Sequence, residues 1–168
     1  LLSRAETFSV RLITATASPN VGILLPNSRE FVISFLGALL CGKTAVPLNY
    51  LLSQQEINCI VKDAGIDLVI TQSFFDEITK NAALPAGASV VQPAELPVIL
   101  YTSGTCNQPK GVMLSNNNLL ANIKSLREVV TIKEFTFMGI LPYFHAFGLT
   151  CGLLTPLLSG AAIVLVKR

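Results

Sequence analysis

The chain has 168 residues, a formal net charge of +2, and 51% hydrophobic but only 13% charged residues. This length suits one domain with a sizeable core. Because a mean hydropathy of +0.60 is high for a free-standing soluble domain, we expect part of the surface to pack against protein outside this sequence. With a charge near zero and no basic run, the sequence gives no sign of nucleic-acid binding.

Helix-capping residues and short apolar runs divide the chain into alternating helices and strands. Ser28, Ser53 and Ser115 are typical N-caps, and Gly42 and Gly65 are typical of the position just after a helix. The apolar runs between the helices are short enough for buried strands. These signals predict, in chain order, a helix at 1–17, a strand at 21–25, a helix at 28–41, a strand at 45–47, a helix at 53–64, a strand at 67–71, a short helix at 73–81, a strand at 97–102, a strand-like run at 111–114, a helix at 115–129, a strand at 136–141, a helix at 147–158 and a strand at 161–166.

Short apolar strands that alternate with helices indicate an α/β fold, with a mostly parallel sheet that helices cover on both faces. We expect residues 1–168 to form a single α/β region. The stretch 84–95 contains Pro85, Gly87 and Pro93, and it is the one candidate for an internal boundary.

The last part of the chain raises the alternative of a membrane-associated protein. Residues 135–166 contain no Asp, Glu, Lys or Arg, and about 20 apolar residues suffice for a spanning helix. Pro142 and Pro156 interrupt this stretch, however, and its parts differ in predicted structure. We therefore predict no transmembrane span and leave peripheral membrane contact open. No secretory signal is visible, which favours a cytoplasmic location.

Four cysteines, Cys41, Cys59, Cys106 and Cys151, are widely spaced and form no Cys-x-x-Cys pair. This spacing argues against a zinc site and against a disulfide scaffold. We predict no metal-binding residues, and we expect reduced, mostly buried thiols in a cytoplasmic protein.

The most informative stretch is residues 101–112, which read Tyr-Thr-Ser-Gly-Thr-Cys-Asn-Gln-Pro-Lys-Gly-Val after an apolar strand. Hydroxyls and successive backbone N–H groups donate hydrogen bonds to phosphate oxygens, a glycine lets the backbone approach an anion, and a lysine adds positive charge. The order of these residues therefore predicts a polyphosphate site rather than an ordinary polar loop. The candidate phosphate-binding residues are Thr102, Ser103, Gly104, Thr105, Cys106 and Lys110.

A Walker-type loop is the obvious alternative, because Gly104 and Lys110 have its spacing. Pro109 stands where that motif has its second glycine, and Gly111 stands where it has the metal-binding hydroxyl. The residues that follow are strand-like rather than the start of a helix. The sequence therefore disfavours a Walker-type site.

The stretch resembles the phosphate loop of the adenylate-forming, or AMP-binding, enzymes, which reads Tyr-Thr-Ser-Gly-Thr-Thr-Gly-x-Pro-Lys-Gly-Val. Residues 21–49, with Leu-Leu-Pro-Asn-Ser-Arg-Glu-Phe and Gly-Lys-Thr-Ala-Val-Pro-Leu-Asn, are similar to the early strand–helix–strand unit of that family. Residues 141–150, Leu-Pro-Tyr-Phe-His-Ala-Phe-Gly-Leu-Thr, are similar to its acyl-site motif. The resemblance is collinear over residues 21–166 and is strongest to fatty acyl-CoA and acyl-acyl-carrier-protein synthetases.

This resemblance implies the N-terminal part of the large domain of an enzyme that uses ATP to activate a carboxylic acid, with a fatty acid favoured. The products would be an acyl-adenylate and pyrophosphate, after which the thiol of CoA or phosphopantetheine would displace AMP. Lys110 would neutralise the phosphates as a catalytic residue, and Mg²⁺ would complete the screening. The later motifs of the family are absent, so we expect no complete reaction without a C-terminal part of the same enzyme.

The resemblance also places His145 beside the acyl carboxylate, with Phe144 and Gly148 as further substrate-binding residues. A core histidine held by backbone groups is the alternative. We favour a role at the substrate, because aromatic residues and a glycine surround the only histidine of the chain. A general-base role is disfavoured, since a carboxylate nucleophile is already ionised at neutral pH. Arg29 and Glu30 are most simply a solvated helix start.

Cys106 and Asn107 depart from the family pattern, which has threonine or serine and then glycine at these positions. Asn tolerates left-handed backbone angles, so the turn can survive, but a thiol donates weakly to phosphate. These departures support the alternative of an inactive pseudo-enzyme or interaction module with the same fold.

Overall fold

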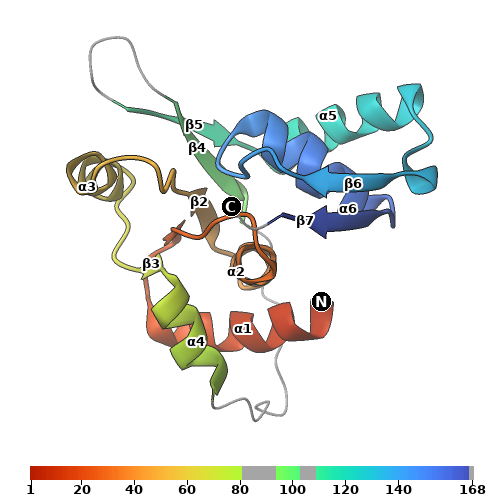
Figure 1. Ribbon diagram of the computed structural model, residues 1–168. Helices are drawn as coiled ribbons and strands as arrows, with labels where there is room; N and C mark the ends of the chain where they lie inside the picture. Colours follow the sequence, from red (N-terminus) through yellow and green to blue (C-terminus); the bar gives the residue numbers. More distant parts are fainter. Residues whose placement is uncertain (81–93, 103–108, 167–168) are drawn as a thin grey trace.

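The computed structural model describes residues 1–80, 94–102 and 109–166, and its strands form a five-stranded and a two-stranded sheet (Figure 1). The large sheet consists of β1 (Asn20–Ile23), β2 (Thr44–Pro47), β3 (Val69–Ile70), β4 (Val98–Thr102) and β5 (Lys110–Leu114). Their spatial order is β3-β1-β2-β4-β5. The small sheet consists of β6 (Thr136–Gly139) and β7 (Ala162–Leu165).

Most strand pairs are parallel. β1 pairs in parallel with β2 and β3, β2 with β4, and β6 with β7. β5 alone runs antiparallel to its neighbour, because only residues 103–109 connect it to β4 and a parallel connection needs a dozen residues or more. The predicted α/β fold with a mostly parallel sheet is confirmed, and the hairpin at its edge is an addition to the prediction.

The predicted helices form in the described part of the chain, and three of them begin at the predicted capping serines. They are α1 (Leu2–Ala15), α2 (Arg29–Leu40), α3 (Gln54–Asp63), α4 (Gln72–Lys80), α5 (Asn116–Val129) and α6 (Thr155–Leu158), with a 3-10 helix at Ile132–Glu134 and a π-helix at Gly148–Leu154. The side chains of Ser28, Ser53 and Ser115 each accept a hydrogen bond from the backbone N–H three residues on. Gly42 and Gly65 take left-handed φ angles of 71° and 59° directly after α2 and α3, which ends these helices.

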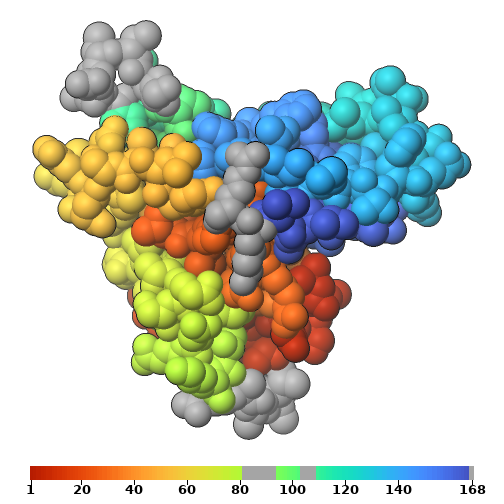
Figure 2. Space-filling view, viewed as in Figure 1, coloured from red at the N-terminus to blue at the C-terminus, as the bar shows by residue number. Residues whose placement is uncertain are grey.

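Helices cover both faces of the large sheet. Side chains alternate faces along a strand, so Ala45 packs in a core with α1, α2 and α4, whereas Val46 packs in a second cluster under α3. α1 crosses α2 closely at Gly37, where a Cβ would lie 2.8 Å from the Phe8 ring. α1 lies on the side of α2 that faces away from the large sheet (Figure 1), and its red spheres border the orange spheres of α2 in the space-filling view (Figure 2).

The second half of the chain carries large exposed apolar side chains. Met113 on β5 and Met138 on β6 are each 61% exposed, and Phe147 is 65% exposed. Val112 and Val164 are also exposed. This is the part of the surface that we expect to pack against further protein.

The uncharged stretch at the end of the chain contains several short elements. The predicted helix at 147–158 is divided into the π-helix and α6. No helix in the described part of the chain has both the length and the apolar character needed to cross a membrane.

The described cysteines differ in exposure. Cys41 is buried and Cys151 is half-buried, but Cys59 is exposed. The expectation of mostly buried thiols is therefore wrong for Cys59, because it lies on the solvent-facing side of the amphipathic helix α3. Cys106 and residues 84–93 of the predicted boundary lie outside the described residues.

Candidate functional site

The β4–β5 hairpin carries the predicted phosphate-binding residues. Thr102 ends β4 and pairs directly with Lys110, which begins β5, and both residues are exposed. The Lys110 side chain makes no hydrogen bond or ion pair in the part of the chain that the structure describes. Four further predicted residues lie outside the described residues, namely Ser103, Gly104, Thr105 and Cys106. The structure therefore places the two ends of the predicted loop.

Tyr101 fixes this hairpin against helix α3. Its hydroxyl donates a hydrogen bond of 2.6 Å to Asp63 Oδ2, at the last residue of α3. Its ring lies over the neighbouring strand, where a Cβ on Gly111 would lie 3.0 Å from Tyr101 Cζ. Burial, and then the hydrogen bond to the Asp63 carboxylate, raise the pKa of Tyr101 well above its ordinary value. These contacts of Tyr101 hold the β4–β5 hairpin, and with it Lys110, against the end of α3.

The second predicted segment, residues 141–150, follows β6 and contains the only histidine. Phe144 is 5% exposed, whereas His145 is exposed. The Phe144 ring packs edge-on against Tyr50 at 5.4 Å and lies 4.5 Å from the His145 ring. Phe147, the next aromatic residue after His145 in the sequence, is mostly exposed. The ring neighbour of His145 is thus Phe144, which Tyr50 fixes.

Asn27 holds this segment in place, and the sequence did not identify it as a site residue. Its Nδ2 donates to the carbonyls of Gly139 at 2.9 Å and Leu141 at 2.7 Å, and its Oδ1 accepts from the N–H of Tyr143 at 3.0 Å. Asn27 is only 6% exposed. The sequence signal that could have identified Asn27 is a polar side chain next to Pro26, between a buried strand and a helix cap. The hydrogen-bond partners of Asn27, however, are more than 100 residues away along the chain.

Gly148 allows the same segment to turn back on itself. A Cβ at this position would lie 2.1 Å from the carbonyl oxygen of Pro142. Gly148 is buried, and the π-helix begins there. π-helical turns frequently occur at functional sites. The structure thus gives Gly148 a packing role, and its predicted contact with substrate stays a prediction.

The hydroxyl of Tyr143 is a buried polar group without a partner in the described part of the chain. Burial raises the pKa of Tyr143 to about 12. We expect Tyr143→Phe to raise the free energy of unfolding by about 1 kcal/mol, because it removes an unsatisfied buried group. Urea unfolding measures this change. The matched variant Tyr101→Phe removes a bonded hydroxyl and should lower stability instead; equal losses in both variants would contradict this account.

Residues from three neighbouring parallel strands meet at one edge of the large sheet. Asn27 lies beyond the carboxyl end of β1, Tyr50 lies beyond that of β2, and Thr102 is the last residue of β4. Through Asn27 and Tyr50 the segment with His145 is anchored at the edge that also carries the phosphate-loop ends. In open α/β sheets, ligands bind outside the carboxyl ends of the strands. This arrangement is typical of nucleotide-binding α/β proteins.

Comparisons with known proteins agree with this class. A family model described as "AMP-binding enzyme" matches residues 1–168. Oxalate–CoA ligase of Arabidopsis thaliana is 31% identical over 176 residues, which cover 86% of this chain and 34% of that protein. The long-chain-fatty-acid–AMP ligase FadD26 of Mycobacterium bovis is 30% identical over 177 residues, which cover 88% of this chain and 30% of that protein.

A solved structure shows the same fold. The O-succinylbenzoate CoA synthetase of Bacillus subtilis, determined with AMP and with its acyl-adenylate intermediate, has a TM-score of 0.85 and 25% identity. The match covers 99% of this chain and 48% of that chain. The chain therefore belongs to the AMP-binding enzyme family, and it spans about a third of the length of the curated relatives above.

Proposed function

We propose that this chain supplies the phosphate loop and part of the acyl site of an enzyme that uses ATP to activate a carboxylic acid and transfers the acyl group to a thiol. The observation that carries this proposal is the convergence of the Thr102–Lys110 pair and the His145 segment on one edge of the sheet. The relatives named as acid–CoA and acid–AMP ligases, and the neighbour solved with an acyl-adenylate, support it.

Lys110 and the loop hydroxyls perform the electrostatic part of the reaction in this proposal. A carboxylate approaches a polyanion only when the phosphate charge is screened and the two groups are aligned. The Lys110 side chain is exposed and forms no ion pair within the described residues, so its ammonium can contact a phosphate. Ser103, Gly104, Thr105 and Cys106 would complete the phosphate contacts.

Magnesium would accompany ATP. Among the described residues, no group of three His, Cys, Asp or Glu side chains could hold a metal ion. We therefore assign no magnesium ligand to them. Phosphate oxygens are usual magnesium ligands, so the metal would enter with the nucleotide.

The acid is proposed to be an aliphatic one of medium or long chain. Phe144 and Gly148 flank His145, and the apolar residues 149–158 follow directly. The likeness to a long-chain-fatty-acid ligase supports this choice, although the relatives also include an oxalate ligase. The thiol acceptor is CoA or the phosphopantetheine of a carrier protein, and the proposed location is the cytoplasm.

The reaction is tested with the complete enzyme that contains this chain. Incubation with ATP, Mg²⁺, hydroxylamine and acids of two to sixteen carbons should give acyl-hydroxamate and pyrophosphate, with the highest yield for medium or long aliphatic acids. The chain without a C-terminal part should give neither product. Failure of a folded, ATP-binding complete enzyme with every acid would favour the inactive pseudo-enzyme.

A further inference from the structure

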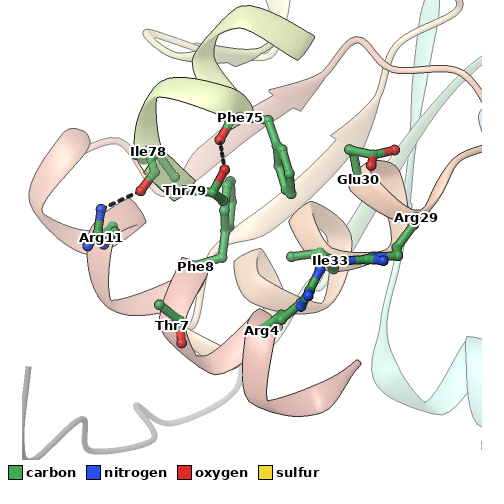
Figure 3. A pocket seen from close by; sticks show the side chains of 10 residues that line it. All are labelled: Arg4, Thr7, Phe8, Arg11, Arg29, Glu30, Ile33, Phe75, Ile78 and Thr79. Atoms are coloured by element: carbon green, nitrogen blue, oxygen red, sulfur yellow. Dashed lines mark hydrogen bonds between the residues drawn. The ribbon is translucent and has the colours of Figure 1, made fainter. Parts of the chain in front are cut away.

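A cavity of about 370 Å³ lies between α1, α2 and α4, and none of the site residues above lines it (Figure 3). Its apolar wall includes the stacked rings of Phe8 and Phe75, whose centroids are 5.4 Å apart, together with Ile33. Phe8 and Ile33 are only 1% and 2% exposed, so the apolar surface that a ligand could contact comes from Phe75, at 8%, and from the half-buried Ile78. This volume falls within the range of small-molecule sites, and the wall offers fixed apolar contact.

Positive charge is concentrated around this apolar wall. Three arginines and one glutamate line the cavity. Arg4 comes from α1 and Arg29 from the start of α2, and their side chains extend toward each other past Ile33 (Figure 3). Neither side chain has a hydrogen bond or ion pair within the described residues. The third arginine, Arg11, donates to the carbonyl of Ile78.

The single carboxylate does not neutralise this charge. Glu30 is half-buried and lines the same cavity, yet it forms no ion pair with either Arg4 or Arg29 in the described part of the chain. Thr7 and Thr79 are the remaining polar lining residues, and the Thr79 hydroxyl already donates to the carbonyl of Phe75. Two solvent-exposed guanidinium groups therefore extend toward each other without an ion pair among the described residues, and an anion bound between them would reduce their mutual repulsion.

We propose that this cavity binds a small amphipathic anion, with its carboxylate or phosphate group between Arg4 and Arg29 and its apolar part against Phe75 and Ile78. Guanidinium groups match both acid groups in a two-pronged geometry. A neutral chain would leave the arginines unpaired, and a compact inorganic anion would leave the apolar wall empty. The site is separate from the sheet edge with Lys110 and His145, and it does not depend on the proposed reaction.

The test is a titration of the chain with octanoate and, separately, octyl phosphate, followed by calorimetry and by NMR of the isoleucine methyl groups. Both probes should bind at one site, and the signals of Ile33 and Ile78 should shift. Comparison of the two affinities shows which acid group the arginines prefer. Octanol has the apolar chain without the acid group, and inorganic phosphate has the acid group without the chain. Each should therefore bind at least about tenfold more weakly than octanoate and octyl phosphate.

Charge variants test the assignment. Arg4→Gln and Arg29→Gln should each weaken binding of both probes by about tenfold, whereas Arg127→Gln, an exposed arginine of α5, should leave it unchanged. The proposal is overturned if neither probe binds saturably at millimolar concentration. It is also overturned if octanol binds as tightly as octanoate, or if both charge variants bind like the parent chain.

Discussion

Replacement of Gly148 by alanine is expected to lower the free energy of unfolding by about 3 kcal/mol. The new Cβ would lie 2.1 Å from the carbonyl oxygen of Pro142 and 3.0 Å from that of Leu141. Both neighbours are backbone atoms, so no side-chain rotation can relieve the clash. The segment with His145 must then move, or the π-helix must shift, and either change disrupts the buried packing around Leu149 and Leu153. Urea unfolding measures the loss.

Gly152 provides the matched control, because it lies in the same π-helix. A Cβ there would have the Tyr143 ring as its neighbour at 3.7 Å, which is an ordinary contact. Gly152→Ala should therefore be nearly neutral, or stabilise the helix by up to about 1 kcal/mol. If both variants behave alike, the close approach at Gly148 does not determine the packing of this segment.

The second large effect is expected at Asn27. Asn27→Asp retains the size of the side chain but replaces the amide donor by an oxygen, which would face the carbonyls of Gly139 and Leu141. The buried carbonyl of Gly139 and the partly buried carbonyl of Leu141 lose their donor, and a carboxylate is placed beside them. We expect a loss of about 3 kcal/mol in the free energy of unfolding, from two unsatisfied groups of between 1 and 3 kcal/mol each.

The NMR signals of His145 show separately whether Asn27→Asp moves the segment that contains this histidine. Because the chain has one histidine, its imidazole proton signals are unambiguous. Asn27→Asp should shift these signals. The control is Asn20→Asp, which removes an amide donor bonded to the carbonyl of Ala64 and should destabilise the fold without moving them. Unchanged imidazole signals in a destabilised Asn27→Asp protein would show that Asn27 supports the fold but does not position the segment.

Local chemistry made most of the secondary structure predictable. The serine caps, the glycines after α2 and α3, and the short apolar strands each depend on neighbours within a few residues, and all of these elements formed as predicted. Parallel pairing also followed, since helical connections between strands favour it. The separation of β6 and β7 into a second sheet was not predicted, because strand partners are chosen by contacts between distant segments.

The candidate site was predictable only in part, for the same reason. The residue types and order of the phosphate loop predicted a phosphate-binding role for Thr102 and Lys110, which stays a prediction, and the structure pairs these two residues across the hairpin. The contribution of Asn27 depends on bonds to residues more than 100 positions later. The cavity joins residues of three helices, so Arg29 and Glu30, read from the sequence as a solvated helix start, were not recognised as its lining.

The central claim is that the β4–β5 hairpin carries a working phosphate site, and calorimetric binding of Mg²⁺–ATP to this chain tests it most directly. We predict saturable binding that Lys110→Ala weakens by at least about tenfold. Lys124→Ala, which removes an exposed lysine of α5, should have no effect. Equal affinity of the parent chain and Lys110→Ala, or no binding to a folded chain even after Cys106→Thr and Asn107→Gly restore the family pattern, would contradict the account.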